Sequence, residues 1–407
     1  MSIGSAFGVQ AMLIISGVIA ARILGVDNRG NLALLWLLAA IPLALIPLGV
    51  PLAMTYYIAL APRTTRALLG SLRRSIAIQA VVLLGIHVTL IVAVFGDRSG
   101  DVRVAAIISL LATPAILALQ YALAVLQGEG RIRAFSFYRV LSTASYGFLL
   151  IPLVVIGTHS LALVATCWVA SLMITGVGAI AHVLTGLPPV TEIEPAELPT
   201  VGTVVGFGLR GLLGSAAPLE VLNLDQTIVG LFVSSHGLGL YVIGTALANL
   251  PQSVAIAIGY VAYPQIAGGR GRSAAATTVR FVLLTVVLTG ALVIVMEVLA
   301  GSLVPIVYGR SFAGAVPVAR VMLLSAVFIG ARRVLGDCVR GLGYPSAATI
   351  AELASIVALL AFAAAFLGHG LIGVAIALTA ASATGFAALV VAVLVIRRRR
   401  HAEAPAQ

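Results

Sequence analysis

Three arginines that could bind an anion, and one aspartate, stand close together in an apolar stretch between residues 332 and 340. Arg333, Asp337 and Arg340 are spaced so that they would share one face of a helix. Arg332 would lie about 100° around the helix from Arg333. The planar guanidinium group presents donors that match pairs of phosphate oxygens. An internal pair between Asp337 and Arg333 is the structural interpretation. Arg332 then has no structural explanation and is the better candidate for a ligand.

A second group of ionisable residues lies in the stretch from Leu209 to Tyr241, which is long and apolar enough to cross a membrane. It carries Arg210, Glu220 and Asp225. Ionisable groups are costly at hydrocarbon depth, so they usually face a protein interior or a watery cavity. Glu220 and Asp225 would be offset by roughly 140° around a helix and are predicted to serve different purposes. One would be an ion or proton site and the other a partner for an arginine, with a charge pair between lobes as the alternative.

The elements that hold these side chains are expected to be membrane-spanning helices. Of the 407 residues, 61% are hydrophobic and 9% are charged, whereas soluble domains carry roughly 25% charge. The net charge is +11, but the basic residues, all arginine, gather in short loops and at the C-terminus. This is the positive-inside pattern of membrane proteins, so nucleic acid is not an expected partner. Two isolated cysteines, Cys167 and Cys338, predict neither a disulfide framework nor a metal site.

Apolar runs near the length needed to cross a bilayer recur twelve times, which predicts an all-α polytopic membrane protein. The first run lacks a basic start and a small-residue cleavage site, so it is expected to be a spanning helix and not a removed signal peptide. The runs cover residues 3–24, 32–60, 76–95, 104–127, 135–157, 161–184, 204–233, 239–266, 279–307, 316–339, 347–367 and 371–396.

The arginines also predict the orientation of the chain. They cluster in the loops after the second, fourth, eighth and twelfth runs, which places both termini in the cytoplasm. One polar, proline-rich linker interrupts the series at residues 186–200. It divides the chain into an N-terminal lobe at 1–185 and a C-terminal lobe at 201–396, followed by a basic tail at 397–407.

The two predicted lobes resemble each other at two loops. ARILGVDNRGNLAL around Gly30 parallels VGLFVSSHGLGLYV around Gly237, 207 positions later. VLQGEGRIRAF around Gly128 parallels CVRGLGYPSAA around Gly341, 213 positions later. Six helices per lobe would give both copies the same orientation. The repeat therefore predicts a pseudo-two-fold axis along the membrane normal, with a substrate path between the lobes.

A family resemblance rests on four segments: ARILGVDNRG, LDQTIVGLFVSSHGLGLY, VPIVYGRSFAGAVPVARVM and RGLGYPSAATIAELASIV. They resemble Wzx-like flippases of lipid-linked oligosaccharides, within the multidrug/oligosaccharidyl-lipid/polysaccharide (MOP) exporter superfamily. The resemblance implies two six-helix lobes around a cavity that opens alternately to each side of a bacterial plasma (inner) membrane. Lipid II flippases are similar too, but they carry two further helices. The chain ends eleven residues after Ile396, so a lipid II flippase is the less favoured interpretation.

The resemblance implies a cargo of sugars on polyprenyl pyrophosphate and gives the ionisable residues their roles. Contacts to the pyrophosphate or to an acidic sugar are predicted for four arginines: Arg22, Arg210, Arg332 and Arg333. Arg22 could instead extend to the outer membrane interface, and Arg210 to the phosphates of the bilayer. Coupling to an ion gradient is predicted for Glu220 or Asp225, because the sequence has no nucleotide-binding loop.

Moving a lipid-linked sugar breaks no bond, so neither a catalytic residue nor a metal or resident cofactor is expected, only a coupling ion such as H⁺ or Na⁺. The predicted partners are the lipid-linked oligosaccharide, the bilayer, and a polysaccharide polymerase with glycosyltransferases. The chain is expected to be a monomer. A multidrug exporter and a non-transporting scaffold of a polysaccharide synthase complex are the alternatives. A membrane glycosyltransferase is less favoured, because the loops are too short to carry a catalytic acid motif.

Overall fold

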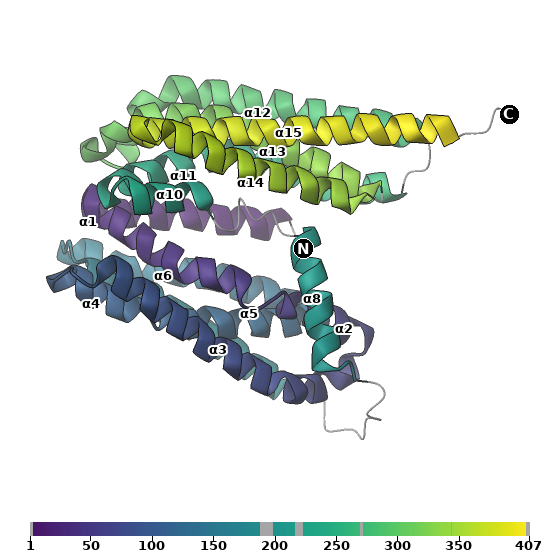
Figure 1. Ribbon diagram of the computed structural model, residues 1–407. Helices are drawn as coiled ribbons and strands as arrows, with labels where there is room; N and C mark the ends of the chain where they lie inside the picture. The colour runs from purple at the N-terminus through teal and green to yellow at the C-terminus, as the bar shows by residue number, and fades with distance from the viewer. Residues whose placement is uncertain (1–2, 188–197, 216–222, 269–271, 343, 404–407) are drawn as a thin grey trace. The chain divides into compact units, whose positions relative to one another are not determined.

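The computed structural model describes residues 3–187, 198–215, 223–268, 272–342 and 344–403, and the regular structure in them is helical (Figure 1). The all-α class predicted from the sequence is confirmed. The helices form two compact units, Met1–Ala216 and Ala217–Gln407. The symmetry axis predicted to relate the two halves stays a prediction.

The first unit contains helices from both sides of the predicted linker. Its helices are α1 (Ile3–Leu45), α2 (Val50–Leu60), α3 (Thr65–Phe95), α4 (Gly100–Ser109), α5 (Ala112–Gly128), α6 (Ile132–Ile156), α7 (Leu161–Thr185) and α8 (Val201–Ser215), with a 3-10 turn η1 (Pro62–Thr64). The second unit contains α10 (Leu224–Phe232), α11 (Ser235–Gly268), α12 (Arg272–Val307), α13 (Val316–Gly341), α14 (Pro345–Phe366) and α15 (Gly370–Glu403), with 3-10 turns η3 (Arg310–Ala315) and η4 (Leu367–His369).

Nine helical segments in the described part of the chain are long and apolar enough to cross a membrane, compared with twelve predicted runs. One of the nine, Ser346–Val395, joins the eleventh and twelfth runs through η4. The second run is broken between α1 and α2, and the fourth between α4 and α5. The seventh run contains α8 and α10, and residues 216–222 between them lie outside the described residues. In the described part of the chain the predicted apolar runs are therefore helical, but the second and the fourth do not form single uninterrupted helices.

Gly25 divides α1 into two arms. Its φ of 68° and ψ of −175° are not helical, and a side chain at that φ would be strained. Figure 1 shows the two purple arms of α1 meeting on the left of the view. Glycine thus lets the first apolar run pass directly into the second, without the loop that the sequence suggested between residues 24 and 32.

Asp101 of α4 fixes the beginning of α7. Its carboxylate accepts hydrogen bonds from the Ser160 hydroxyl at 2.6 Å and from the backbone N–H groups of Leu161 at 2.5 Å and Ala162 at 3.3 Å. The first N–H groups of a helix lack partners within the helix and carry partial positive charge, so a carboxylate satisfies and stabilises them. The contact joins Asp101 of α4 to Leu161 of α7, two residues sixty positions apart in the sequence.

Helix α8 packs on the turn between α1 and α2, inside the first unit. Gly49 and Gly208 allow this approach, because a Cβ on Gly208 would lie 2.5 Å from the carbonyl oxygen of Leu48. The ring of Phe207 stacks on Tyr56, with ring centroids 4.5 Å apart. The C-terminal lobe was predicted to begin at residue 201. Helix α8 belongs to the first compact unit, Met1–Ala216, and the predicted lobe boundary stays a prediction.

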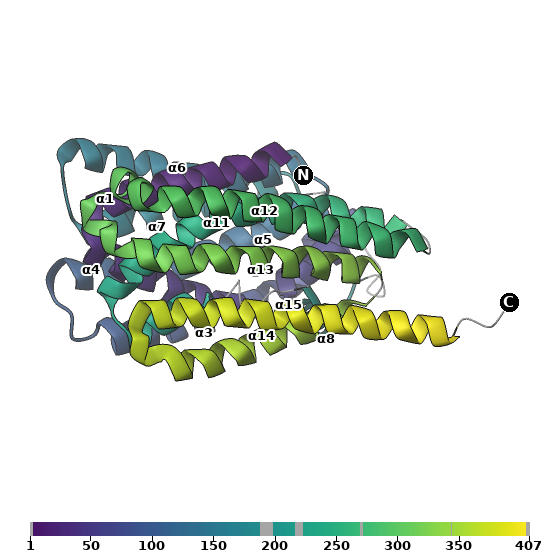
Figure 2. The ribbon, with the colours of Figure 1, turned by 90° about the horizontal axis from the view of Figure 1, so that it is seen from above.

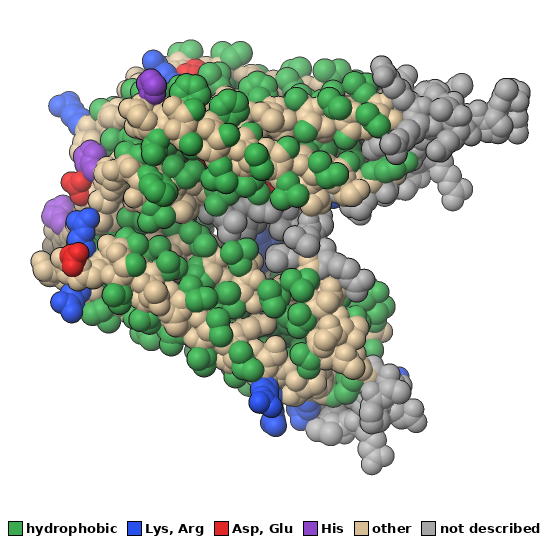
Figure 3. Space-filling view, viewed as in Figure 1, with side chains coloured by type: hydrophobic (Ala, Val, Ile, Leu, Met, Phe, Trp, Pro, Cys, Tyr) green, Lys and Arg blue, Asp and Glu red, His purple; other side chains and the backbone are tan. Residues whose placement is uncertain are grey.

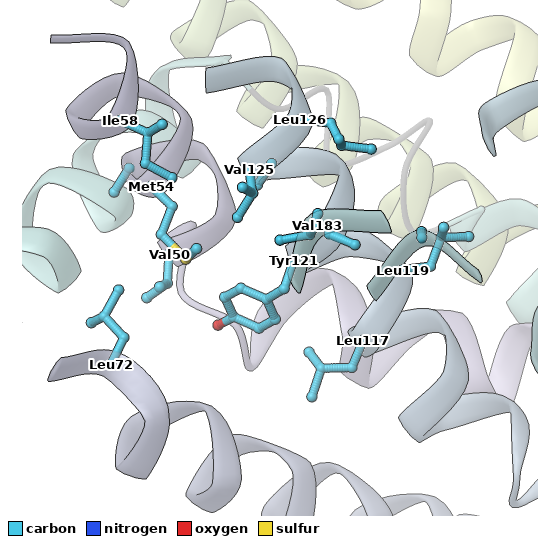
Figure 4. Packing of buried hydrophobic residues seen from close by; sticks show 14 of the residues in the cluster. Val50, Met54, Ile58, Leu72, Leu117, Leu119, Tyr121, Val125, Leu126 and Val183 are labelled. Carbon is cyan, nitrogen blue, oxygen red and sulfur yellow. The ribbon is translucent and has the colours of Figure 1, made fainter. Parts of the chain in front are cut away.

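The core of the first unit lies between α2, α3, α5 and α7 (Figure 4). Val50, Met54 and Ile58 repeat along one face of α2 at helical spacing and are fully buried. Tyr121 of α5 enters the same core and donates a hydrogen bond to the Gln79 side chain at 2.5 Å. The apolar contacts hold these helices together, and the buried tyrosine hydroxyl has its partner.

Helix α13 is the centre of the second unit, where it packs against α11, α12 and α15, and Figure 2 shows it between α12 and α15. Small residues allow the close contacts: Gly244 of α11 lies against Ala319, and Gly330 of α13 lies against Ala255. Small residues are favoured in helix contacts within a bilayer, because they let the backbones approach. Such packing makes α13 the element that positions Arg332 and its neighbours.

Large apolar side chains are exposed in both units. The face shown in Figure 3 carries many hydrophobic side chains and few charged ones. Among the most exposed are Val155, Ile156, Val298 and Ile306, each at least 70% accessible. A soluble protein rarely exposes such continuous apolar surface. A bilayer solvates it, so the structure describes a multi-pass membrane protein.

Candidate functional site

Arg332 is buried in the second unit and forms an ion pair with Glu352 of α14. Both side chains are nearly inaccessible, at 4% for Arg332 and 8% for Glu352. The Arg332 Nη1 atom, which forms the ion pair, also lies 3.4 Å from the Ser355 hydroxyl. Gly385 of α15 makes room for this group, because a Cβ there would overlap Ser355. Arg332 therefore has a structural partner, and the expectation that it would be a spare arginine is wrong.

Three further charged residues of α13, Arg333, Asp337 and Arg340, lie nearer its C-terminal end. Asp337 accepts a hydrogen bond from Arg340 at 2.9 Å, one helical turn later. Gly259 of α11 faces the same carboxylate, since a Cβ there would overlap it. Arg333 is half-buried. Its predicted pairing with Asp337 stays a prediction, and its substrate role is also untested.

Asp225 is buried at the beginning of α10, with 7% of its surface accessible. Its carboxylate interacts with backbone N–H groups in the first helical turn. The hydroxyl of Tyr241, a fully buried residue of α11, lies beside it. A helix N-terminus favours a negative charge, so the fold provides a place for an acid in an apolar setting. This arrangement is compatible with the predicted ion site but does not test it.

The remaining predicted residues are differently placed. Arg22 is exposed near the end of the first arm of α1, three residues before Gly25. The side chain of Arg210 and the whole of Glu220 lie outside the described residues. The structure thus brings Asp225, Arg332 and Arg333 into one unit and Arg22 into the other.

A buried cluster of one arginine and three aromatic rings lies in the first unit. It comprises Arg29 and Trp36 on the second arm of α1, Tyr146 on α6 and Trp168 on α7. The Arg29 guanidinium lies over the Trp36 ring, 5.4 Å from its centroid. The Trp36 centroid is 6.0 Å from that of Tyr146 and 5.7 Å from that of Trp168. We call these four residues the aromatic–arginine cluster.

Sequence reasoning missed two features of these sites. Arg29 falls between the first two predicted runs, where a loop is expected, but it is 4% accessible, whereas Arg22 is exposed. The i, i+7 spacing of Arg29 to Trp36 is the one signal that could have suggested a shared helix face. Glu352 falls within the eleventh predicted run, and the structure pairs it with Arg332. Because Arg332 and Glu352 lie on different helices, no spacing rule could have joined them.

No group of three metal-ligating side chains occurs in the part of the chain with described positions. Cys167 lies in the first unit and Cys338 in the second, and both are free thiols. The chemistry available at these sites is therefore that of hydrogen bonds, ion pairs and cation–π contacts.

Comparison with solved structures gives the class of the fold. A lipid II flippase, MurJ, in an inward closed conformation has a TM-score of 0.73 at 15% identity, covering 96% of this chain and 86% of that one. An inward-facing multidrug resistance MATE family transporter of the MOP superfamily has a TM-score of 0.72 at 15% identity, covering 100% and 97%. An outward-facing MATE transporter has a TM-score of 0.61 at 15% identity, covering 98% and 96%. The chain therefore has the fold of MOP-superfamily transporters.

The family follows from the sequence model that matches residues 19–317, described as "polysaccharide biosynthesis protein". This match covers well over half of the chain, and the chain belongs to that family. The resemblance to MOP-superfamily flippases is confirmed at this level. No curated protein sequence matches the chain.

Proposed function

We propose that this protein flips polyprenyl-pyrophosphate-linked oligosaccharide from the inner to the outer leaflet of a bacterial plasma membrane. The observation that carries the proposal is the combination of membership in a polysaccharide biosynthesis family with a fold shared by a lipid II flippase. A lipid-linked sugar is the intermediate of polysaccharide synthesis that such a fold could move. Flipping changes no covalent bond, so the protein acts as a transporter and not as an enzyme.

The barrier to this movement is the transfer of a pyrophosphate and many hydroxyls through hydrocarbon. A protein lowers the barrier by offering charged and polar groups in place of water. Of the predicted substrate residues whose side chains are described, Arg22 is exposed and Arg333 is half-buried. Arg332 has the competing structural role described by its ion pair with Glu352. We assign cargo contact first to Arg22 and Arg333, with Arg210 as a further member.

Energy for the transport is proposed to come from an ion gradient, with H⁺ or Na⁺ bound at Asp225. The carboxylate is buried, lies at a helix N-terminus and has the Tyr241 hydroxyl beside it. Binding or release of a cation there would change the charge of a buried group, which is the kind of local event that can bias alternating access. Glu220 is the second candidate for the same role.

Two alternative functions predict different results in a deletion strain. A multidrug exporter is suggested by the MATE-like fold. Its cavity would be expected to attract cationic drugs, whereas arginine predominates among the charges identified above. A non-transporting scaffold of a polysaccharide synthase complex would bind the polymerase and glycosyltransferases without moving cargo. Drug sensitivity of a deletion strain distinguishes the first alternative, and the position of the lipid-linked intermediate distinguishes the second.

The deciding experiment deletes the gene and locates the lipid-linked oligosaccharide by its accessibility to a membrane-impermeant reagent in intact cells. The proposal expects the intermediate to accumulate on the cytoplasmic leaflet, inaccessible from outside. Re-expression of the protein should restore the outer pool. Normal outer exposure in the deletion strain would refute flipping, and loss of the oligosaccharide itself would favour a biosynthetic role. Reporter fusions at each terminus test the proposed cytoplasmic placement.

A further inference from the structure

The aromatic–arginine cluster contains two buried hydrogen-bond donors without partners. The indole N–H of Trp36 and the hydroxyl of Tyr146 are inaccessible to solvent and have no hydrogen-bond partner within the described structure. Tyr146 itself is 5% accessible. Buried polar groups are almost always satisfied, because an unmade hydrogen bond in an apolar setting is costly. These two donors on neighbouring rings are therefore available to an acceptor that the described residues do not supply.

The charge around these donors is positive. The Arg29 guanidinium lies 5.4 Å from the Trp36 centroid, and its charge acts on the Tyr146 hydroxyl. Arg29 also has another interaction of its own, so the groups left for a ligand are those of Trp36 and Tyr146. An indole N–H can only donate, and the phenol can donate when a partner accepts. The ligand that suits such a place is an acceptor with negative charge.

Three helices hold the donors in place. Trp36 comes from the second arm of α1, Tyr146 from α6 and Trp168 from α7, and the rings are in contact edge to face or at a tilt. The Asp101 contacts at the start of α7, together with the packing of α1 on α6, position these helices. The donors are thus fixed before a ligand arrives, which reduces the entropy cost of binding.

We propose that the aromatic–arginine cluster is a binding site for one oxyanion, a carboxylate or phosphate group carried by the cargo. The inference rests on the proposed function and narrows it, since it assigns recognition of an anionic cargo group to residues of the first unit and not to the charges of α13. A carboxylate or phosphate oxygen accepts hydrogen bonds from both rings and is attracted by Arg29. A water molecule would satisfy the two donors but would bring two protons into a group of side chains that mainly donate.

The chain itself supplies the probe for a test. Trp36 and Trp168 are its only two tryptophans, so fluorescence excited selectively at tryptophan, and not at the ten tyrosines, reports on the cluster. The full-length protein in detergent micelles is titrated with sodium glucuronate, with inorganic pyrophosphate, and with glucose as the neutral sugar. Sodium chloride keeps the ionic strength constant throughout. We expect a saturable change in fluorescence with glucuronate, with pyrophosphate or with both, and none with glucose.

The two sources of the oxyanion are distinguished by which titration saturates. A response to glucuronate alone assigns the site to an acidic sugar, and a response to pyrophosphate alone assigns it to the lipid carrier. Tyr146→Phe removes one donor and keeps the ring, so the affinity for the active anion should fall about tenfold. Tyr138→Phe is the matched control on the same helix, because its hydroxyl bonds the Gly178 carbonyl and does not belong to the cluster. It should leave the affinity unchanged.

Several results would overturn the proposal. An equal response to glucose would mean that the cluster does not select anions. An unchanged affinity in Tyr146→Phe, with fluorescence and folding otherwise normal, would show that the hydroxyl is not a ligand. No saturable response to either anion would mean that water satisfies the donors. If the deletion strain confirms flipping while this binding test fails, the proposed function stands and cargo is recognised elsewhere. If anions bind but export is normal without the protein, the site stands and the proposed function falls.

Discussion

Removing one partner of the Arg332–Glu352 pair should destabilise the second unit strongly, whereas removing both should not. The two side chains are 4% and 8% accessible and come from neighbouring helices. Arg332→Met leaves a carboxylate buried without its counter-ion, and Glu352→Met leaves a guanidinium in the same position. In the double variant Arg332→Met/Glu352→Met, two apolar side chains of suitable size replace the pair.

The expected magnitudes follow from this burial. Breaking a buried ion pair by removing one partner costs about 3–5 kcal/mol, because the other charge stays in an apolar setting. For a unit of roughly this size, each kcal/mol corresponds to about 2–4 °C in Tm, so each single variant should lose about 6–20 °C. Replacing both charges by apolar groups is often neutral or stabilising, so the double variant should recover to within about 1 kcal/mol of the parent.

A thiol-reactive dye can follow the unfolding of the second unit by itself. Cys167→Ser removes the thiol of the first unit and leaves Cys338, which is fully buried on α13, as the only cysteine. The dye then reacts as α13 becomes accessible on heating. The four proteins, parent, two single variants and double variant, are compared in this background in the same detergent.

The reasoning would be refuted by single variants that melt with the parent, or by a double variant whose loss equals the sum of the two single losses. Either result would mean that the charges do not depend on one another. The same proteins address the predicted substrate role of Arg332. A stable double variant that still supports surface polysaccharide would exclude an essential cargo contact at this position.

Three further substitutions test particular contacts. Asp225→Asn should abolish ion-dependent transport without loss of folded protein, because the amide keeps the size of the side chain but cannot carry the charge; full ion-dependent transport would place coupling elsewhere. Gly208→Ala should cost about 1–3 kcal/mol, since its Cβ would meet the α1–α2 turn, while Gly206→Ala, with open space around it, should not; equal thermal stabilities would contradict this packing. Asp101→Ala should lower the free energy of unfolding by about 1–2 kcal/mol and speed amide exchange at the start of α7, whereas Asp97→Ala should do neither. Slow exchange in both variants would show that the Asp101 carboxylate does not stabilise the first turn of α7.

Most of the fold could be predicted from the sequence because bilayer physics leaves few choices. Apolar runs of about 20 residues must form helices whose backbone groups are satisfied internally, so the composition already determines the class. The breaks were harder to predict. Gly25 replaces a loop by an abrupt change of direction, and Gly208 lets α8 pack closely on the turn between α1 and α2. The first depends on a positive φ and the second on a close backbone approach, and a hydropathy pattern contains neither.

The candidate site was less predictable for a related reason. The sequence shows that Arg332 and Asp225 are present in apolar stretches, and it predicts that such residues face a protein interior or a watery cavity. It does not show that Arg332 meets Glu352 on the next helix, or that Asp225 lies beside Tyr241. Sequence spacing reports only on neighbours within one helix, whereas these pairs belong to different helices.

By itself, then, the sequence determined that this is a helical membrane protein of the MOP type, with arginines and acids at costly depths. Tertiary structure alone decided which of those charges are satisfied by the protein and which donors are left for a ligand. The physical reason is that the bilayer acts on each segment separately, through its apolar length. A buried charge or donor is satisfied by whatever side chain another helix brings within hydrogen-bonding distance, and only packing determines that.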